Sequence, residues 1–109
     1  MKQYLDLHQT AKLIELGFEK PSSIASVEPI YGIGGISVAK AYTIGELIEM
    51  LPKEINDGLQ SRLGVYIDHN KMWAVDYSNI LGELCSTYHT ELIDALYDMA
   101  VKLKEKGVI

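Results

Sequence analysis

The sequence predicts an α+β fold in a single domain, residues 1–109, with a four-stranded, largely antiparallel sheet of two hairpins and three helices. The predicted order is α-β-β-α-β-β-α. Three observations support it: three segments repeat apolar residues at helical spacing, two regions are rich in β-branched and aromatic residues, and the two kinds of segment alternate. Hairpins that alternate with helices favour an antiparallel sheet with helices against one face.

The first helix is predicted at residues 7–16. Asp6, followed three residues later by Gln9, is a typical N-terminal capping pair. Gly17 stands where a helix often ends in left-handed geometry, and Phe18 then packs back onto the last turn. This segment therefore carries both its start and its stop signal.

Two strands are predicted near residues 23–31 and 36–42, where β-branched and aromatic residues alternate with Ser and Gly. The segment Gly32-Ile33-Gly34-Gly35 joins them. Pro29 has no N–H to donate to a neighbouring strand, so the first of the two is expected at a sheet edge.

A short helix follows Thr43, which forms a capping box with Glu46. Its apolar stripe consists of Ile44, Leu47, Ile48 and Leu51. Pro52 biases the preceding residue away from helical geometry and is expected to end or kink the helix there. Because it lies between the two strand regions, we interpret this helix as the central packing element.

The second hairpin, which follows the turn Asn56-Asp57-Gly58, has a register that the sequence can decide. A loop with an odd number of residues, such as 69–71, gives one fully apolar face, whereas a one-residue slip would oppose Leu63 with Asp76. The predicted pairs are Ile67 with Trp73, Val65 with Val75, and Leu63 with Tyr77. Asn70 or Lys71 is expected to adopt the left-handed conformation.

The other face of this hairpin carries a possible interaction surface of four residues: Tyr66, Asp68, Met72 and Asp76. Tyr and Met are enriched at protein interfaces, whereas Asp is depleted. An ordinary solvated sheet face is the alternative interpretation.

The last helix is predicted to be capped by Thr87 or Thr90, to run for about 17–20 residues and to end at Gly107. Its apolar positions are Tyr88, Leu92, Ile93, Leu96, Met99, Ala100 and Leu103. The lysines near its end complement the helix dipole. Residues 78–86 fit no single element.

Cys85 and His89 are four residues apart and share one face if the last helix begins early. A metal site needs three or four ligands, and His8 and His69 are not placed to complete one. The sequence therefore predicts no metal, no cofactor and no catalytic residue, and a lone Cys is most often a small buried apolar residue.

The glycines of G-x-G-G, Gly32, Gly34 and Gly35, precede strand-like residues rather than a helix, unlike a phosphate-binding loop. The segment Y-T-I-G-E-L, residues 42–47, resembles the opening of the DNA-binding region in MerR-type winged-helix regulators. Pro52, an acidic turn and a hairpin then replace the basic recognition helix of that family. With a net charge of −5, we expect no nucleic-acid partner.

Three segments together resemble a family of small uncharacterised proteins from gut bacteria and their phages or mobile elements. They are L-I-E-L-G-F (13–18), L-I-E-M-L-P-K-E-I (47–55) and E-L-I-D-A-L-Y-D-M-A-V-K-L-K-E-K-G (91–107). The resemblance implies a cytoplasmic, phage-derived protein and carries over no activity and no catalytic residue.

The chain has one cysteine, no apolar run near the roughly 20 residues of a membrane span, and no signal-peptide core at its start. These features favour a cytoplasmic protein without a membrane partner. We expect a small non-enzymatic accessory or interaction protein whose partner is a protein, either itself or another. The alternative is a small-ligand-binding domain or enzyme with a pocket near Gly32–Gly35.

Overall fold

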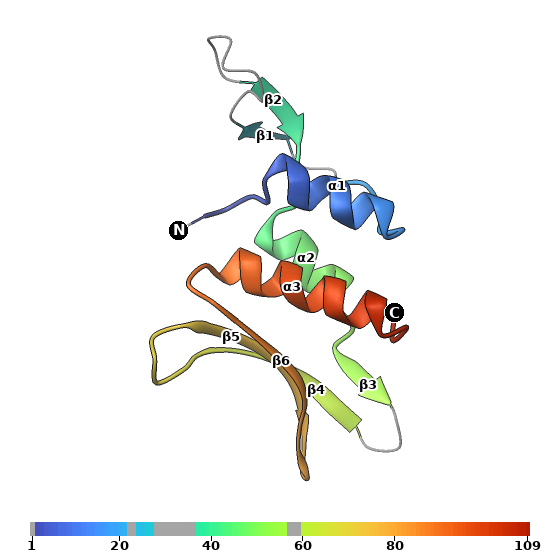
Figure 1. Ribbon diagram of the computed structural model, residues 1–109, viewed down its shortest axis with the longest axis vertical. Coiled ribbons are helices and arrows are strands. Elements are labelled where there is room, and N and C mark those ends of the chain that lie inside the picture. The colour runs from blue at the N-terminus through green and yellow to red at the C-terminus, as the bar shows by residue number, and fades with distance from the viewer. Residues whose placement is uncertain (1, 22–23, 28–36, 57–59) are drawn as a thin grey trace.

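The computed structural model describes residues 2–21, 24–27, 37–56 and 60–109. Over these residues it confirms an α+β fold with three helices and a four-stranded antiparallel sheet (Figure 1). The elements are α1 (Leu7–Glu15), β1 (Ile24–Val27), β2 (Ser37–Lys40), α2 (Ile44–Met50), β3 (Glu54–Asn56), β4 (Gln60–Ile67), β5 (Trp73–Asn79), β6 (Gly82–His89) and α3 (Leu92–Glu105).

The strands of the main sheet differ from the expected set. Its order is β3-β4-β5-β6, while β1 and β2 pair with each other in a separate two-stranded sheet. The predicted hairpins therefore do not share one sheet. The two edge strands of the main sheet are β3 and β6. Strand β3 follows α2 and pairs with β4. Strand β6 pairs with β5 and contains residues that fit no single element in the sequence, together with the expected start of the last helix. The Gly32–Gly35 segment, Pro29 and the Asp57-Gly58 turn lie outside the described residues.

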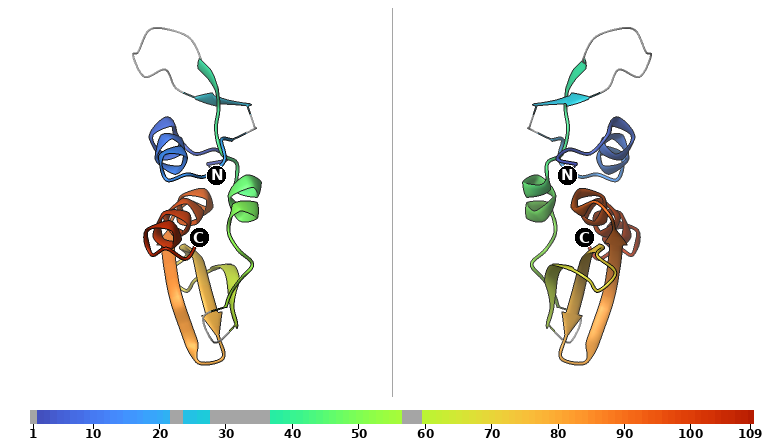
Figure 2. Two further views of the ribbon diagram at one scale, coloured as in Figure 1. Left: turned by 90° about the vertical axis from the view of Figure 1, so that its right-hand side faces the viewer. Right: turned by 90° about the vertical axis from the view of Figure 1, so that its left-hand side faces the viewer.

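The elements are stacked in layers along the longest of three dimensions, 53 × 32 × 18 Å (Figure 2). The main sheet lies at one end, α3 packs on β5 and β6, α1 and α2 pack against α3, and the β1–β2 hairpin lies at the other end. Helix α3 is thus buried between the sheet and the other two helices.

The expectation that the Thr43 helix is the central packing element is wrong, because α3 has that place. Most of α3 is buried, including Leu96, Met99 and Leu103. In α2 only Leu47 is buried, and Ile48 of its predicted stripe is 36% exposed. The helix has seven residues because Leu51, directly before Pro52, already has an extended backbone with ψ 135°.

The predicted register of the β4–β5 hairpin is confirmed at all three predicted pairs. The Asp68 N–H donates to the Met72 carbonyl at 2.9 Å, which closes the loop on residues 69–71. Lys71 has a φ of 60°, the left-handed conformation expected there. The length of the loop therefore determines which side chains of β4 and β5 share a face of the sheet.

The signals at the ends of α1 are confirmed. Asp6 and Gln9 form a capping box, Gly17 has a φ of 98°, and the Phe18 N–H donates to the Leu13 carbonyl at 3.1 Å. The C-terminal stop of α3 is of the same kind, with a φ of 74° at Gly107.

The predicted start of the last helix is wrong. Helix α3 begins at Leu92 with Glu91 as its N-cap, and no side chain caps it. Thr87 belongs to β6, and its Oγ1 donates to the Ala95 carbonyl of α3 at 2.8 Å. Tyr88 matches helical spacing with Leu92, but pairing with β5 extends it as a strand. The helix has 14 residues and is about 21 Å long.

The capping box at the start of α2 can be tested by substitution of Thr43. Both capping-box hydrogen bonds are present, with the Glu46 N–H donating to Thr43 Oγ1 at 3.2 Å. Thr43→Ala should lower the free energy of unfolding by about 1 kcal/mol in chemical denaturation. Thr43→Ser keeps the hydroxyl and should stay close to wild type. Equal losses in both variants would show that the hydroxyl does not stabilise the helix.

Candidate interaction surface on the open face of the sheet

The two faces of the sheet have different surroundings because successive strand residues point to opposite sides. On one face, Cys85 and Thr87 of β6 contact α3 through Met99 and Ala95. We call the opposite face the open face, since α3, the helix that packs on β5 and β6, lies on the other side. The residues of the open face are Arg62, Gly64, Tyr66, Ala74, Asp76, Ser78, Glu83, Leu84, Ser86 and Tyr88.

Two neighbouring rows cross the open face at right angles to the strands. Tyr66, Ala74 and Tyr88 form one row, and Gly64, Asp76 and Ser86 form the next. The two tyrosines are 43% and 45% exposed, while the Ala74 between them is fully buried. The surface is therefore bounded by two aromatic side chains with small residues beneath them.

Asp76 is the central polar group of this surface and is only 8% exposed. The Tyr66 hydroxyl, diagonally across the strand pair, donates to Asp76 Oδ2 at 3.2 Å. The other oxygen, Oδ1, occupies the space over Gly64, where an added Cβ would lie 2.6 Å from it. The absence of a side chain at residue 64 thus makes room for the carboxylate.

The electrostatics of this pair follow from burial. Burial raises the pKa of Asp76, the hydrogen bond from Tyr66 lowers it, and the nearby Glu83 raises it further. Loss of solvent and the Asp76 carboxylate together raise the pKa of Tyr66 to about 12. Tyr66 is therefore a protonated donor at neutral pH.

The β5–β6 turn adds apolar surface at the far end of the sheet. Ile80 and Leu81 form its two-residue loop and are 93% and 80% exposed, and Leu84, at a bulge in β6, is 39% exposed. Such loops usually carry Asn, Asp or Gly. Hydrogen bonding of the Leu81 N–H to the Asn79 side chain at 2.8 Å holds the turn without a polar loop residue.

The structure places the four predicted surface residues on one side of the hairpin, but with different roles. Tyr66 is exposed, Met72 is half-buried and Asp76 is buried. The Asp68 carboxylate accepts the N–H groups of Asn70 and Met72 at 2.9 and 3.0 Å, so it shapes the loop. That these four residues bind a partner stays a prediction.

Sequence reasoning missed Tyr88 and Leu84, which extend this surface onto β6. The sequence pattern favours the last helix for Tyr88, and Leu84 lies in a segment that fits no single element. The available signal was alternation: Cys85 and Thr87 face the core, and Leu84, Ser86 and Tyr88 face away from it.

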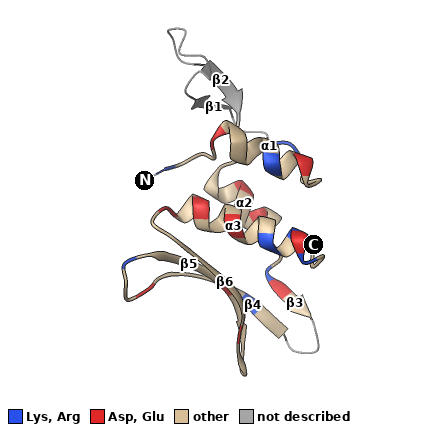
Figure 3. Cartoon of the chain, in the orientation of Figure 1, with Lys and Arg blue, Asp and Glu red and all other residues tan. Residues whose placement is uncertain are grey.

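Charge is sparse on the strands that form the open face (Figure 3). Strands β4, β5 and β6 each contain one charged residue: Arg62, Asp76 and Glu83, respectively. Arg62 pairs with Glu54 of β3 at 3.5 Å. The surface around Asp76 is thus aromatic and apolar with acidic groups.

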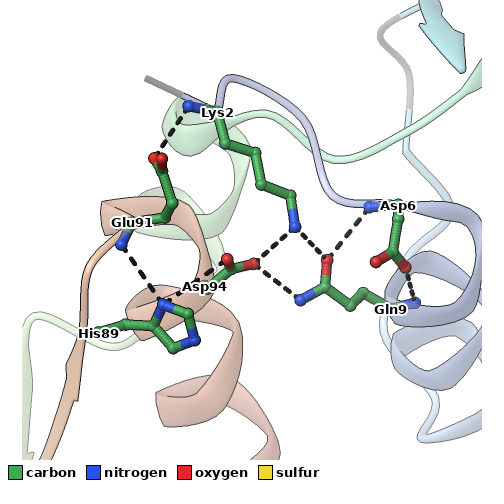
Figure 4. A network of polar contacts seen from close by, with 6 residues as sticks. All are labelled: Lys2, Asp6, Gln9, His89, Glu91 and Asp94. Atoms are coloured by element: carbon green, nitrogen blue, oxygen red, sulfur yellow. Dashed lines mark hydrogen bonds and ion pairs between the residues drawn. The ribbon is translucent and has the colours of Figure 1, made fainter.

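A second polar cluster joins the N-terminal segment to α3 (Figure 4). Asp94 Oδ1 accepts from Lys2 Nζ and from Gln9 Nε2, both at 2.8 Å. The Lys2 N–H donates to the Glu91 carboxylate at 2.9 Å. Each group has a partner from another element, so we interpret this network as structural.

Cys85 and His89 do not form a site. Both lie in strand β6, where four residues span about 13 Å. Cys85 is a buried free thiol whose pKa is raised by burial, and its Sγ lies 3.8 Å from Met99 Sδ. The His89 ring nitrogen Nδ1 accepts the Glu91 N–H at 3.3 Å. Over the described residues, no group of three or more His, Cys, Asp or Glu side chains is arranged to hold a metal.

A hollow of about 550 Å³ lies between the end of α1 and α2. It is lined by Gly17, Phe18, Glu19, Lys20, Tyr42, Glu46, Glu49 and Met50. Inside it, the Tyr42 hydroxyl donates to the Glu19 carbonyl. These residues form no nucleophile with an adjacent base, and the pocket predicted near Gly32–Gly35 lies outside the described residues.

Fold and surface together define a small α+β domain in which α3 packs on one sheet face at β5 and β6, where Val65 and Ile67 of β4 stay exposed, and leaves the opposite face open. Comparisons of the chain with models of protein families, with curated proteins and with solved structures found no match. None of the helices in the described part of the chain has the length and apolar character needed to cross a membrane.

Proposed function

We propose that this chain is a small non-enzymatic protein-interaction domain whose partner docks on the open face and the β5–β6 turn. The observation that carries the proposal is the exposure of three large side chains on the open face, Tyr66, Leu84 and Tyr88, and of two more, Ile80 and Leu81, in the β5–β6 turn. Exposed apolar clusters of this kind mark interaction sites.

The composition of the surface supports a protein partner. Tyrosine is enriched at interfaces and among the residues that dominate binding energy, because its large ring loses little conformational entropy. Neighbouring small residues, Gly64, Ala74 and Ser86, let a partner approach the sheet closely. The acidic groups Asp76 and Glu83 disfavour a phosphate backbone.

We also propose a cytoplasmic location for this interaction. Cys85, the single cysteine of the chain, is a buried free thiol. A reducing compartment suits such a residue, since oxidising compartments favour disulfide-bonded chains.

Native mass spectrometry of the chain, purified gently from cells that express it, tests the proposal. We expect an added protein mass, either another chain or a second copy. The double variant Leu84→Ser and Tyr88→Ser should weaken this complex by about thirtyfold, the effect of removing interface residues worth about 2 kcal/mol. Ile48→Ser, an equally exposed apolar position on α2, is the matched control and should bind normally.

A wild-type chain that carries no protein mass, or a complex that tolerates the double variant, would contradict the proposal. A small added mass would instead favour the ligand-binding alternative.

A further inference from the structure

We propose that the partner places an arginine side chain on the open face, with its guanidinium against the Asp76 carboxylate and between the rings of Tyr66 and Tyr88. This inference rests on the proposed interaction function and names the chemistry of its central contact.

Asp76 is an acidic side chain more than nine-tenths buried without a cation beside it. Of the ion pairs among the described residues, none involves Asp76, and its one hydrogen bond is the donation from Tyr66 to Oδ2. Oδ1 accepts no hydrogen bond from the described residues. It is not fully enclosed by them either, so an incoming group can reach it. Buried carboxylates are normally paired, and this oxygen is accessible enough to accept from an incoming donor.

Two neighbouring residues determine the position of the Asp76 carboxylate. Gly64 leaves the space that Oδ1 fills, and the Tyr66 hydroxyl fixes Oδ2. A glycine in a strand interior weakens the strand and often marks a close approach of another group. Here one glycine and one hydroxyl hold the carboxylate in place and leave a single acceptor oxygen free.

The flanking tyrosines favour arginine as the occupant. Tyr66 and Tyr88 stand on either side of Ala74, two strand spacings or about 10 Å apart along the sheet. A planar group in contact with both rings needs about 7–8 Å between them, so the two side chains would lean inward by about 2–3 Å in the complex. Guanidinium is planar, stacks on aromatic faces and is more weakly hydrated than ammonium, so it loses less on burial.

The negative charge around Asp76 also favours a cationic partner group. Glu83 lies near Asp76 and adds negative charge, and the cation nearest in the strand pattern, Arg62, is turned to Glu54. The chain as a whole carries a net charge of −5. A cationic side chain from a partner would relieve the repulsion between the acidic groups on this face.

The test uses N-acetyl-arginine amide as the probe, followed by amide chemical shifts of the full chain in two-dimensional NMR. We expect shifts that saturate and are centred on Gly64, Asp76 and Tyr88. N-acetyl-citrulline amide, which has nearly the same shape without charge, should produce none of them. Asp76→Asn should weaken binding of the arginine probe about tenfold, the size expected for one charge-assisted hydrogen bond.

We expect Asp76→Asn to fold, so a loss of probe binding in this variant reports on the carboxylate and not on unfolding. The pKa of Asp76 is raised above its ordinary value of 3.8, so its contribution to stability is present below that value and is lost as the pH rises. An uncharged Asn avoids this loss at neutral pH and can still accept from Tyr66. Tyr88→Leu keeps the carboxylate but removes one ring, and it should also weaken binding of the probe.

Three outcomes would overturn the inference: no saturable shifts, equal shifts with citrulline amide, or unchanged binding in Asp76→Asn. Equal or tighter binding of N-acetyl-lysine amide would overturn the choice of guanidinium. If the protein complex depends on Leu84 and Tyr88 but tolerates Asp76→Asn, the interaction function stands and the arginine contact is wrong.

Discussion

Leu96→Ala is expected to lower the free energy of unfolding by about 2–5 kcal/mol, the range for truncating a buried leucine. Leu96 is fully buried in α3, between the sheet and the other helices. Removing its side chain leaves a cavity in the core, which the surrounding side chains fill only in part. Chemical denaturation followed by circular dichroism measures the loss.

The control for this variant is Ile48→Ala. Ile48 lies on the predicted apolar stripe of α2 but is 36% exposed, so its truncation should cost less than about 1 kcal/mol. A larger loss at Ile48 than at Leu96 would mean that α2, and not α3, is the centre of the core.

Asp94→Ala is expected to destabilise the chain by about 1.5–3 kcal/mol, because hydrogen bonds to a charged group are among the stronger ones. The Asp94 carboxylate accepts from Lys2 and Gln9, and its side chain is 12% exposed. The variant removes the hydrogen bonds that link α3 to Lys2 and to Gln9 of α1. Hydrogen exchange should therefore show lower protection in α1 in addition to the global loss.

The pH dependence of this variant has a definite sign. Burial raises the pKa of Asp94, but the hydrogen bonds from Lys2 and Gln9 outweigh it, so the pKa is lowered from its ordinary 3.8. A lowered pKa stabilises the folded state above the ordinary value, and that stabilisation is lost as the pH falls through the folded value. The gap between wild type and Asp94→Ala should therefore persist at pH 5 and close below pH 3.8.

Asp98→Ala is the matched control, since Asp98 lies one turn further along α3 and is exposed. Its effect should stay within about 0.5 kcal/mol. Equal losses at Asp94 and Asp98 would contradict a specific role for the network in Figure 4.

Features that depend on a few neighbouring residues could be predicted from the sequence. The capping boxes at Asp6 and Thr43 and the stops at Gly17 and Gly107 need only local hydrogen bonds and backbone angles. The β4–β5 register followed from a parity argument, because a slip by one residue would have turned the apolar side chains to the wrong face.

Features that depend on distant pairing could not be predicted. Residues 82–89 are compatible with a strand and, near Tyr88, with a helix, and only β5 as a neighbour decides for the strand. The three residues of β3 have no strand pattern of their own and are held by pairing with β4.

The candidate surface, too, could be predicted from the sequence only in part. Parity along the hairpin placed Tyr66 and Asp76 on one side, away from the apolar face. The sequence did not indicate that Asp76 is buried, because its burial depends on the space over Gly64 and on the ring of Tyr66. Nor did it indicate that Tyr88 faces Tyr66 across Ala74, which requires β6 to pair with β5.

The sequence by itself thus determined where helices start and stop and which side chains of the hairpin share a face, because these depend on contacts within a few residues or across one loop. The tertiary structure alone decided that α3 is the centre of the core, that β3 and β6 complete the sheet, and that the buried Asp76 carboxylate lies beside the row of Tyr66 and Tyr88. These features depend on surfaces brought together from distant parts of the chain, where the free energy of burial and strand pairing outweighs local preference.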